Sequence, residues 1–356
     1  VQAILYGDGG AYASLSEKVL TRATTHASGP YDVPNVRVDC FAAYTNNVPA
    51  GAFRGFGVSQ SCFAVESNMD ILAAELEIDP VELRRRNALE VGSTTVTGQL
   101  MRESVGLQEC IERVDTDMRT RDVPWTSDDG HRRFACGLAV GYKNTGHGGG
   151  APDKATAEVE AWQDSDRGLV AEVRISSAEM GQGLPGVLAA CVAEQLGTAT
   201  ENVGVLLGDT DVCPDGGPTT ASRQTFVSGN AARLAARDVA RKLAAAPGES
   251  AVAQHEYWAP KTQPLGTGGD MHVAFSFAAQ AALCAIDKRT GEVEVQKIIA
   301  AHDVGRAINP LTLEGQIEGG IVMCCLLYTS DAADDNRVVG GGGGGGAGGG
   351  GGGGGG

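Results

Sequence analysis

The chain has 356 residues, of which 42% are hydrophobic and 20% charged, and this is enough for two domains with cores of their own. Lys and Arg number 28 against 44 Asp and Glu, and the net charge of -16 repels nucleic acid and anionic membrane surfaces. No apolar run approaches the roughly 20 residues of a membrane span, and the first residues lack the pattern of a signal peptide. We therefore expect a cytoplasmic globular protein with no nucleic-acid partner and no membrane partner.

The first third of the chain predicts a strand followed by two helices. Residues 35–46 alternate between apolar and polar positions, which is typical of a strand, and a glycine-rich loop follows them. After this loop, apolar residues recur at three- and four-residue steps, which indicates the buried face of a helix that ends near Asp79. The residues of this expected buried face are Cys62, Val65, Met69, Leu72 and Leu76.

Three consecutive arginines follow on the second predicted helix. Arg84, Arg85 and Arg86 have the charge to bind an anion, but Glu82 and Glu90 lie beside them in the sequence. Mixed charges at this spacing are typical of a solvent-exposed helix face. We interpret the three arginines as such a solvated face.

The segment 121–133 is the best internal boundary, because it is polar and is interrupted by Pro and Gly. It divides the chain into a first part, 1–125, and a second part, 126–323. In the second part strands and helices follow one another in a mixed order, which predicts an α+β fold. Its expected elements are strands at 134–142, 155–162, 169–176 and 204–211, helices at 187–197 and near 225–246, and a strand pair over 281–303.

Residues 324–356 differ in character from the rest of the chain. Of the last 17 residues 16 are Gly, and such a run cannot offset the entropy of ordering its backbone. The stretch CLLYTSDAAD resembles the translation of a transposase sequencing adapter. We interpret the residues from Cys325 onward as a non-biological tail that packs against nothing.

Several common chemical motifs are absent from the sequence. The nine cysteines form no CxxC pair and have no His at zinc spacing, so we expect reduced thiols and no metal held by protein ligands. The sequence also contains no GxxxxGK[ST], no HExxH and no GxSxG motif. A P-loop NTPase and a zinc protease are therefore excluded at the level of motifs, and the nucleophile motif of a lipase-like hydrolase is missing.

Residues 181–186, GQGLPG, fit the pattern GxGxxG between a predicted strand and a predicted helix. Asp209 and Asp211 follow some twenty-odd residues later, as a dinucleotide site requires, and the amides of such a helix start can hold a pyrophosphate. Pro185, however, removes one amide donor, and Gln182 places a side-chain amide between the first two glycines. A nicotinamide or flavin dehydrogenase stays an alternative, and so does a purely structural turn.

Four motifs, taken in order, resemble those of the molybdopterin-binding catalytic subunit of the xanthine dehydrogenase and aldehyde oxidase family. They are GAFRGFGVSQ at 51–60, EMGQG at 179–183, GDTDVCPDGGPTTASRQTFVSGNA at 208–231 and HDVGRAINPLTLEGQIEGG at 302–320. The similarity extends over residues 1–323 and is greatest to the selenium-dependent xanthine dehydrogenase branch. It implies the mixed helix-and-sheet fold of the family's molybdopterin-binding domains, with 1–125 and 126–323 as its first and second parts.

The resemblance also implies a cofactor and a reaction. The cofactor is molybdenum bound by molybdopterin, either plain or as the cytosine dinucleotide, and such a large anionic ligand needs backbone amides from several glycine-rich loops. The reaction is hydroxylation of an electron-poor carbon with oxygen from water, with iron-sulfur clusters and FAD on partner subunits. GAFRGFG contains no Cys, which argues against the carbon monoxide dehydrogenase branch. A purine or related N-heterocycle is the expected substrate, and an aldehyde is the second.

Residue by residue, Arg54 matches the family's Arg beside the molybdenum, and Phe56 matches the aromatic residue that stacks on a flat substrate. If one cofactor is bound by all the matching residues, the loops that carry them must border one cleft, with the amides of Gln182 and Gln316 facing it. The residues that match cofactor contacts are Gly55, Gly181, Gln182, Gly183, Thr219, Ala221, Ser222, Arg223 and Gln316.

The sequence also departs from the family pattern. The family's general base, a Glu well beyond EGQIEGG, is not reached, and the family's first cofactor loop does not precede the motifs. We therefore expect an internal fragment that does not turn over substrate as given, because a positioned base typically contributes ~10²- to 10⁴-fold. A non-catalytic scaffold is the third hypothesis, and it predicts neither molybdenum nor pterin.

Overall fold

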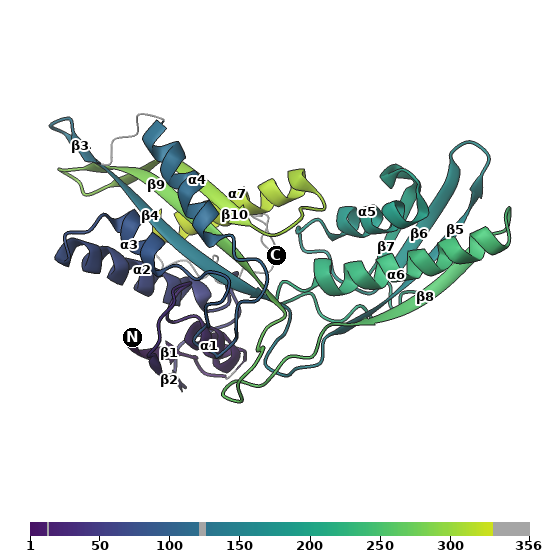
Figure 1. The fold of residues 1–356 in the computed structure, drawn as a ribbon, viewed down its shortest axis with the longest axis horizontal. Helices are drawn as coiled ribbons and strands as arrows, with labels where there is room; N and C mark the ends of the chain where they lie inside the picture. Colours follow the sequence, from purple (N-terminus) through teal and green to yellow (C-terminus); the bar gives the residue numbers. More distant parts are fainter. Residues whose placement is uncertain (13, 121–125, 330–356) are drawn as a thin grey trace, which may run out of the picture. The chain divides into compact units, whose positions relative to one another are not determined.

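The computed structural model describes residues 1–12, 14–120 and 126–329, and it divides the chain into two compact units (Figure 1). The first unit comprises 1–151 and 261–306, and the second comprises 152–260 and the chain from 307. The first unit contains β1 (Gln2–Asp8), α1 (Ser16–Thr25), β2 (Arg37–Ala43), α2 (Val58–Glu75), α3 (Pro80–Asn87), α4 (Leu107–Thr120), β3 (Thr126–Asp128), β4 (Arg132–Thr145), β9 (Ala274–Asp287) and β10 (Val293–Asp303). The second contains β5 (Lys154–Asp164), β6 (Gly168–Ile175), α5 (Leu184–Leu196), the short 3-10 helix η1 (Thr200–Asn202), β7 (Val203–Leu207), α6 (Gln224–Ala245), β8 (Ala251–Trp258) and α7 (Pro310–Thr329).

A four-stranded antiparallel sheet forms the centre of the first unit, in the order β10-β9-β4-β3. Helix α4 lies across β9 and β10, as Figure 1 shows, and its apolar face closes the core. Leu107, Ile111 and Val114 recur at the steps of one helix face and are fully buried there. They pack with inward-facing strand residues such as Val140 and Phe277.

The N-terminal part of the first unit is a β-α-β arrangement, in which β1 and β2 pair in parallel around α1. The predicted strand at 35–46 is thus confirmed as β2, and the predicted helix is confirmed as α2. The expected buried face of α2 is wrong in its second half, because Leu72 and Leu76 are 45% and 52% exposed. The buried positions of α2 are instead Ser61, Glu66 and Ala73.

The interpretation of the three arginines as one solvated face is wrong for Arg84, which is completely buried. Its guanidinium donates to Glu66 Oε2 at 2.8 Å and pairs with Asp70 at 2.8 Å. Glu66, itself buried, also accepts from the Tyr31 hydroxyl at 2.6 Å and from the Val140 amide at 2.9 Å. Burial and the nearby Glu66 together raise the pKa of Tyr31 far above its ordinary value, so this hydroxyl stays a donor.

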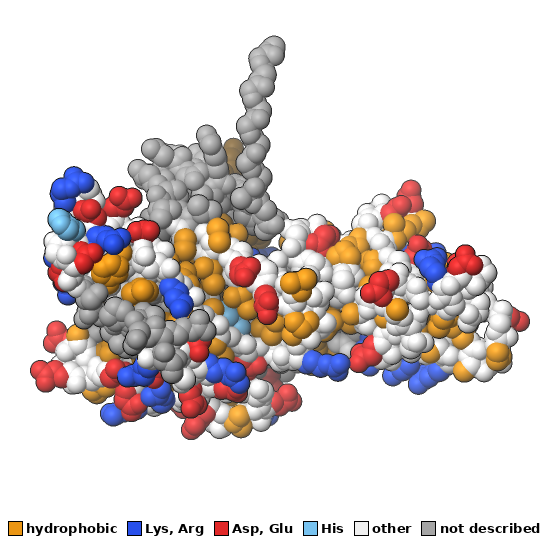
Figure 2. Space-filling view, turned by 90° about the horizontal axis from the view of Figure 1, so that it is seen from above, with side chains coloured by type: hydrophobic (Ala, Val, Ile, Leu, Met, Phe, Trp, Pro, Cys, Tyr) orange, Lys and Arg blue, Asp and Glu red, His pale blue; other side chains and the backbone are white. Residues whose placement is uncertain are grey.

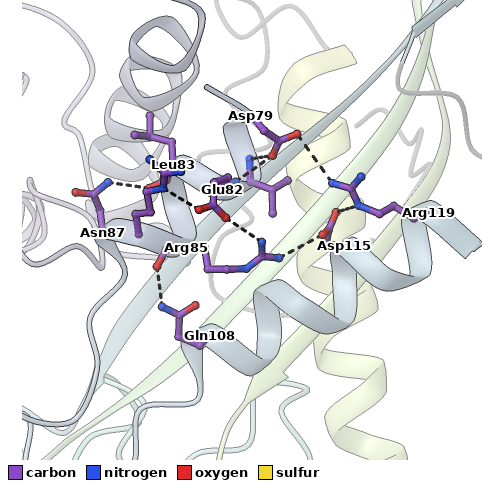
Figure 3. A network of polar contacts seen from close by, with 10 residues as sticks. Asp79, Glu82, Leu83, Arg85, Asn87, Gln108, Asp115 and Arg119 are labelled. Carbon is purple, nitrogen blue, oxygen red and sulfur yellow. Dashed lines mark hydrogen bonds and ion pairs between the residues drawn. The ribbon is translucent and has the colours of Figure 1, made fainter. Parts of the chain in front are cut away.

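The other two arginines do lie at the surface, and Arg85 belongs to the polar network of Figure 3. Arg85 bridges Glu82 on its own helix and Asp115 on α4, whereas Arg86 pairs with Glu82 alone. Asp79 caps α3 by accepting from two backbone amides of the first turn, and Pro80 occupies the first helical position. The network therefore fastens α3 to α4 on the outside of the core.

The second unit is a four-stranded mixed sheet, in the order β7-β6-β5-β8, with α5 and α6 packed on one face (Figure 1). Strand β5 alternates strictly, and its inward positions are Ala155, Ala157, Val159 and Ala161. The small alanines allow α6 to approach the sheet closely. Strands β6 and β7 are parallel and are joined by α5, so the predicted strand-helix-strand order of this region is confirmed.

The remaining predictions have different outcomes. The strand pair at 281–303 and the helix near 225–246 are confirmed as β9, β10 and α6, whereas β1, α4 and β8 were not predicted. Residues 325–329, at the start of the predicted tail, form the last turn of α7. The rest of the predicted tail, residues 330–356, lies outside the described residues. The predicted boundary at 125/126 lies at the edge of a second undescribed stretch, residues 121–125. The division at that boundary stays a prediction.

The surface carries mixed charge rather than a single sign. In Figure 2, acidic and basic side chains are interspersed over the visible face, with hydrophobic side chains between them. Within the described ranges, no helix is both long and apolar enough to cross a membrane.

Candidate functional site

The turn between β6 and α5 contains the predicted cofactor residues Gly181, Gln182 and Gly183. Both glycines have positive φ, at 97° and 80°, which Gly adopts without steric cost. The carboxylate of Glu179 lies inside this turn and accepts from the amides of Gly181 at 2.7 Å and Gly183 at 3.0 Å through Oε1. Its Oε2 accepts from the Leu184 amide at 2.7 Å. The first free amides of α5 are therefore occupied by the chain's own carboxylate.

The side chain of Gln182 bonds within its own turn. Its Oε1 accepts from the Met180 amide at 2.6 Å, and its Nε2 donates to the Ala178 carbonyl at 3.0 Å. The amide is thus oriented by two hydrogen bonds at one end of the turn. Its contact with a cofactor stays a prediction.

A second predicted loop, residues 216–223, lies against this turn. Thr219 Oγ1 donates to the Ala178 carbonyl at 2.9 Å and accepts from the Ala178 amide at 3.1 Å. Below the loop, the completely buried Arg223 pairs with Asp153 at 2.6 Å and donates to the carbonyls of Gly216 and Pro218. The Arg223 guanidinium is therefore engaged inside the protein, where it fixes the path of the loop.

Ala221 and Ser222 have left-handed backbone conformations, with φ of 51° and 53°. This region is sterically costly for residues with a Cβ and concentrates at functional sites. Neither amide donates a hydrogen bond to any residue that the structure describes. Two adjacent free amides just before the N-terminus of α6 are donors that suit an anionic ligand.

The first turns of α7 complete this group of loops. Gln316 Nε2 donates to the Gly181 carbonyl at 3.0 Å, although 135 residues separate the two in sequence. A Cβ placed on Gly183 would lie 3.4 Å from Thr312, so α7 also packs closely on the turn. The predicted residues of the second unit, from Gly181 to Gln316, are thereby brought together.

Arg54, Gly55 and Phe56 belong to the first unit, in the loop that leads into α2. Phe56 has a φ of 52°, which is again a left-handed conformation at a residue with a Cβ. The loop lies directly against α1, because a Cβ on Gly57 would collide with the Val19 carbonyl and would lie 3.1 Å from the Ala23 amide. Whether this loop shares a cleft with the loops of the second unit stays a prediction.

A cluster of nitrogen-bearing side chains lies beside this helix, and sequence inspection did not find it. Arg22 on α1 donates to the His147 carbonyl at 3.0 Å and contacts the ring of His272 at 3.1 Å. His26 caps the same helix, and Lys143 lies near the end of β4. His26 and His272 are 2% and 1% exposed, and their rings are 6.2 Å apart. The glycine-rich segment 146–150, GHGGG, is a local sequence signal that could have drawn attention to this region.

The cluster has an unusual electrostatic state. Burial and the nearby Arg22 lower the pKa of Lys143 to about 7. Burial, together with Arg22 and Lys143, lowers the pKa of His272 to about 3. Burial also lowers the pKa of His26 and of Arg22. The Nε2 atom of His26 has no hydrogen-bond partner among the described residues. Four basic groups thus lie near one another in a largely buried part of the first unit.

Two further observations bear on the alternatives. The dinucleotide interpretation of GQGLPG loses its phosphate donors, because Glu179 occupies them. In addition, β7 lies at the edge of its sheet, with no parallel neighbour beyond it among the described residues. A cleft of about 890 Å³ between α4 and β10 is lined by residues such as Glu109 and Asp303, and by none of the predicted site residues. No group of metal-ligating side chains was found among the described residues.

Comparison with known proteins identifies the class. Models of the molybdopterin cofactor-binding domain match residues 1–88 and, in two overlapping stretches, 109–256 and 244–333. The chain therefore belongs to the molybdopterin-binding domains of the xanthine dehydrogenase and aldehyde oxidoreductase family. The free amides of Ala221 and Ser222 fit a polar anion of this kind, whereas the amides of the turn at 178–184 are already bonded to Glu179.

Three individual relatives show how similar the chain is to known proteins and how much of their length it covers. The chain is 29% identical to a probable xanthine dehydrogenase protein of Bacillus subtilis, over 90% of this chain and 46% of that protein. A shorter stretch, 32% of the chain, is 52% identical to the nicotinate dehydrogenase large molybdopterin subunit of Eubacterium barkeri, of which it covers 27%. The solved aldehyde oxidoreductase from Desulfovibrio gigas has a TM-score of 0.79 at 26% identity, over 96% of this chain and 40% of that one. The chain thus spans less than half the length of these relatives, and the assignment to the selenium-dependent branch stays a prediction.

Proposed function

We propose that this chain is the cofactor-holding part of a molybdenum hydroxylase that oxidises a purine or related N-heterocycle with oxygen derived from water. The loops at 178–184 and 216–223 and the start of α7 would hold the molybdopterin, through the free amides of Ala221 and Ser222 and the side chains of Gln182 and Gln316. When bound, the cofactor would supply the redox chemistry and the activated oxygen. Iron-sulfur and FAD partner subunits would then carry the electrons away.

The basic cluster of Arg22, Lys143, His26 and His272 is the observation that favours a heterocycle. When an oxygen nucleophile adds to a ring carbon beside nitrogen, negative charge develops on the ring and on its exocyclic oxygens. Preorganised cations and N–H donors in a poorly solvated site stabilise such charge strongly. Arg22 on α1 supplies the cation, and Lys143 and His272, whose pKa values are lowered, supply N–H donors beside it. The loop of Arg54 and Phe56 packs against the same helix.

The flat ring itself would be held by Phe56, in the left-handed conformation that the loop imposes on it. Aromatic rings gain about 0.5–1.5 kcal/mol from stacking beyond the area they bury. An aldehyde is the second candidate substrate, because the D. gigas enzyme has a similar fold. An aldehyde develops negative charge on its single carbonyl oxygen and has no ring nitrogen, so it offers the cluster fewer acceptors than a hydroxypurine does.

The substitution Arg22→Met in the protein that contains this chain tests the proposal. We expect oxidation of a hydroxypurine to fall by about 10²- to 10³-fold in kcat/KM, as for the loss of one preorganised donor, while oxidation of an aromatic aldehyde changes far less. Arg37→Met, at a side chain that is 72% exposed, is the matched control. Molybdenum analysis and pterin fluorescence must show equal cofactor in all three proteins. Equal losses on both substrates would contradict the role of the cluster.

Lys143 should also react as a neutral amine near pH 7. With a pKa of about 7, roughly three quarters of Lys143 is unprotonated at pH 7.5, against about one in a thousand for an ordinary lysine. We expect acylation of Lys143, followed by peptide mass spectrometry, to titrate with a midpoint near pH 7. The exposed Lys18 serves as the internal control. Arg22→Met should raise the midpoint, because the charge of Arg22 contributes to the shift. A midpoint of Lys143 equal to that of Lys18 would refute the burial of this amine.

A further inference from the structure

The carboxylate of Glu179 occupies a position that a bound anion takes in other proteins. Helix N-termini present unpaired amides and a partial positive charge, which together attract anions. Here two such amides, of Gly183 and Leu184, and the amide of Gly181 in the preceding turn converge on the two oxygens of Glu179. The carboxylate comes from four residues before Gly183, the cap residue of α5, and no side chain at the cap position itself bonds these amides.

The same turn is attached to the two other segments of the site. The Gly181 carbonyl accepts from Gln316, and Ala178 exchanges two hydrogen bonds with Thr219. A change in the turn would therefore displace its contacts with α7 and with the loop at 216–223. Glu179 is exposed to solvent, so its removal deletes no core contact.

We propose that Glu179 is a built-in anion that fixes the turn at 178–184 for cofactor binding and excludes phosphates and other oxyanions from the start of α5. This role rests on the proposed cofactor function of Gly181, Gln182 and Gly183. Glu179 is a positioning residue, because it acts through the amides that it binds. Because Glu179 occupies the amides of this turn, the turn can have the pattern GxGxxG between a strand and a helix without binding a dinucleotide.

The first experiment uses the chain without cofactor. In Glu179→Ala the three amides lose their carboxylate, and a small oxyanion can replace it. We expect sodium formate and inorganic phosphate to raise the melting temperature of Glu179→Ala above its value in sodium chloride of equal ionic strength. The wild type should show no such difference, and neither should Glu201→Ala, a control at an exposed glutamate of the same unit. Identical responses of the three proteins to formate and phosphate would overturn the proposal.

The second experiment uses the complete cofactor-loaded protein and measures bound molybdenum and pterin per chain. Residues that orient the direct ligands of a site typically change affinity by about 10- to 100-fold, and we expect a loss of this size in Glu179→Ala. Formate in the loading buffer should restore cofactor content in Glu179→Ala and leave Glu201→Ala unchanged, a rescue that general destabilisation would not show. Full cofactor content in Glu179→Ala without formate would overturn the positioning role. If the wild type itself binds no pterin, the proposed function fails, while the formate and phosphate experiment still decides what Glu179 does.

Discussion

Replacing Arg84 with alanine is expected to destabilise the first unit by about 3–5 kcal/mol, because it leaves the buried carboxylate of Glu66 without its cation. Arg84 is completely buried and Glu66 is 6% exposed at its side chain. The same substitution removes hydrogen bonds from the guanidinium to the carbonyls of Glu66 and Pro80. Tyr31 and the Val140 amide would then donate to a carboxylate that has lost its only buried cationic partner within the described residues.

Arg86→Ala is the matched control, since it removes the same side chain two residues away. Arg86 is 60% exposed and pairs with Glu82 at one helical turn, so its loss should cost no more than about 0.5 kcal/mol. Urea unfolding followed by fluorescence or circular dichroism gives both values. Glu66→Gln in the Arg84→Ala background completes a double-mutant cycle, and it should recover part of the loss because no buried charge remains. Similar losses for Arg84→Ala and Arg86→Ala would contradict the buried pair.

Replacing Arg223 with methionine should have a comparable effect on the second unit. The guanidinium pairs with the buried Asp153 and donates to the carbonyls of Gly216, Pro218 and Lys154. Its loss removes the cation that pairs with the buried carboxylate of Asp153 and removes this donor from the three carbonyls, which together cost about 3–5 kcal/mol. Since Gly216 and Pro218 begin the loop that carries Ala221, the loop should also lose its fixed path.

Two measurements separate these effects. Thermal or urea unfolding of Arg223→Met reports the loss of stability, and the pterin content of the cofactor-loaded protein reports the loop. Arg241→Met, at a side chain that is 69% exposed and pairs with Asp238 within its own helix, is the control. It should change stability by at most about 1 kcal/mol and leave cofactor content unchanged. Retention of wild-type stability in Arg223→Met would contradict the buried role of this side chain.

Local periodicity in the sequence was sufficient to predict most secondary structure. The alternation of β5 and the three- and four-residue steps in α6 reflect burial of one face, and burial leaves this mark on any single element. The exposed Leu72 and the buried Glu66 of α2 show the limit of the method. Hydrophobicity alone does not reveal that Arg84 and Tyr31 will supply the partners that let a carboxylate be buried.

The order of the glycine-rich motifs was likewise sufficient to name Gln182, Ala221 and Gln316 as candidate cofactor residues. Such motifs can be recognised in a sequence because close backbone approach requires Gly and turn residues at fixed positions. No sequence motif predicted the basic cluster, because Arg22, Lys143 and His272 are far apart in the chain. They meet only when α1, β4 and the segment before β9 pack together. The occupation of the α5 amides by Glu179 was equally hidden. The pattern GxGxxG indicates where backbone amides can be free. The folded turn determines which acceptor they bond, and here it is the carboxylate of Glu179.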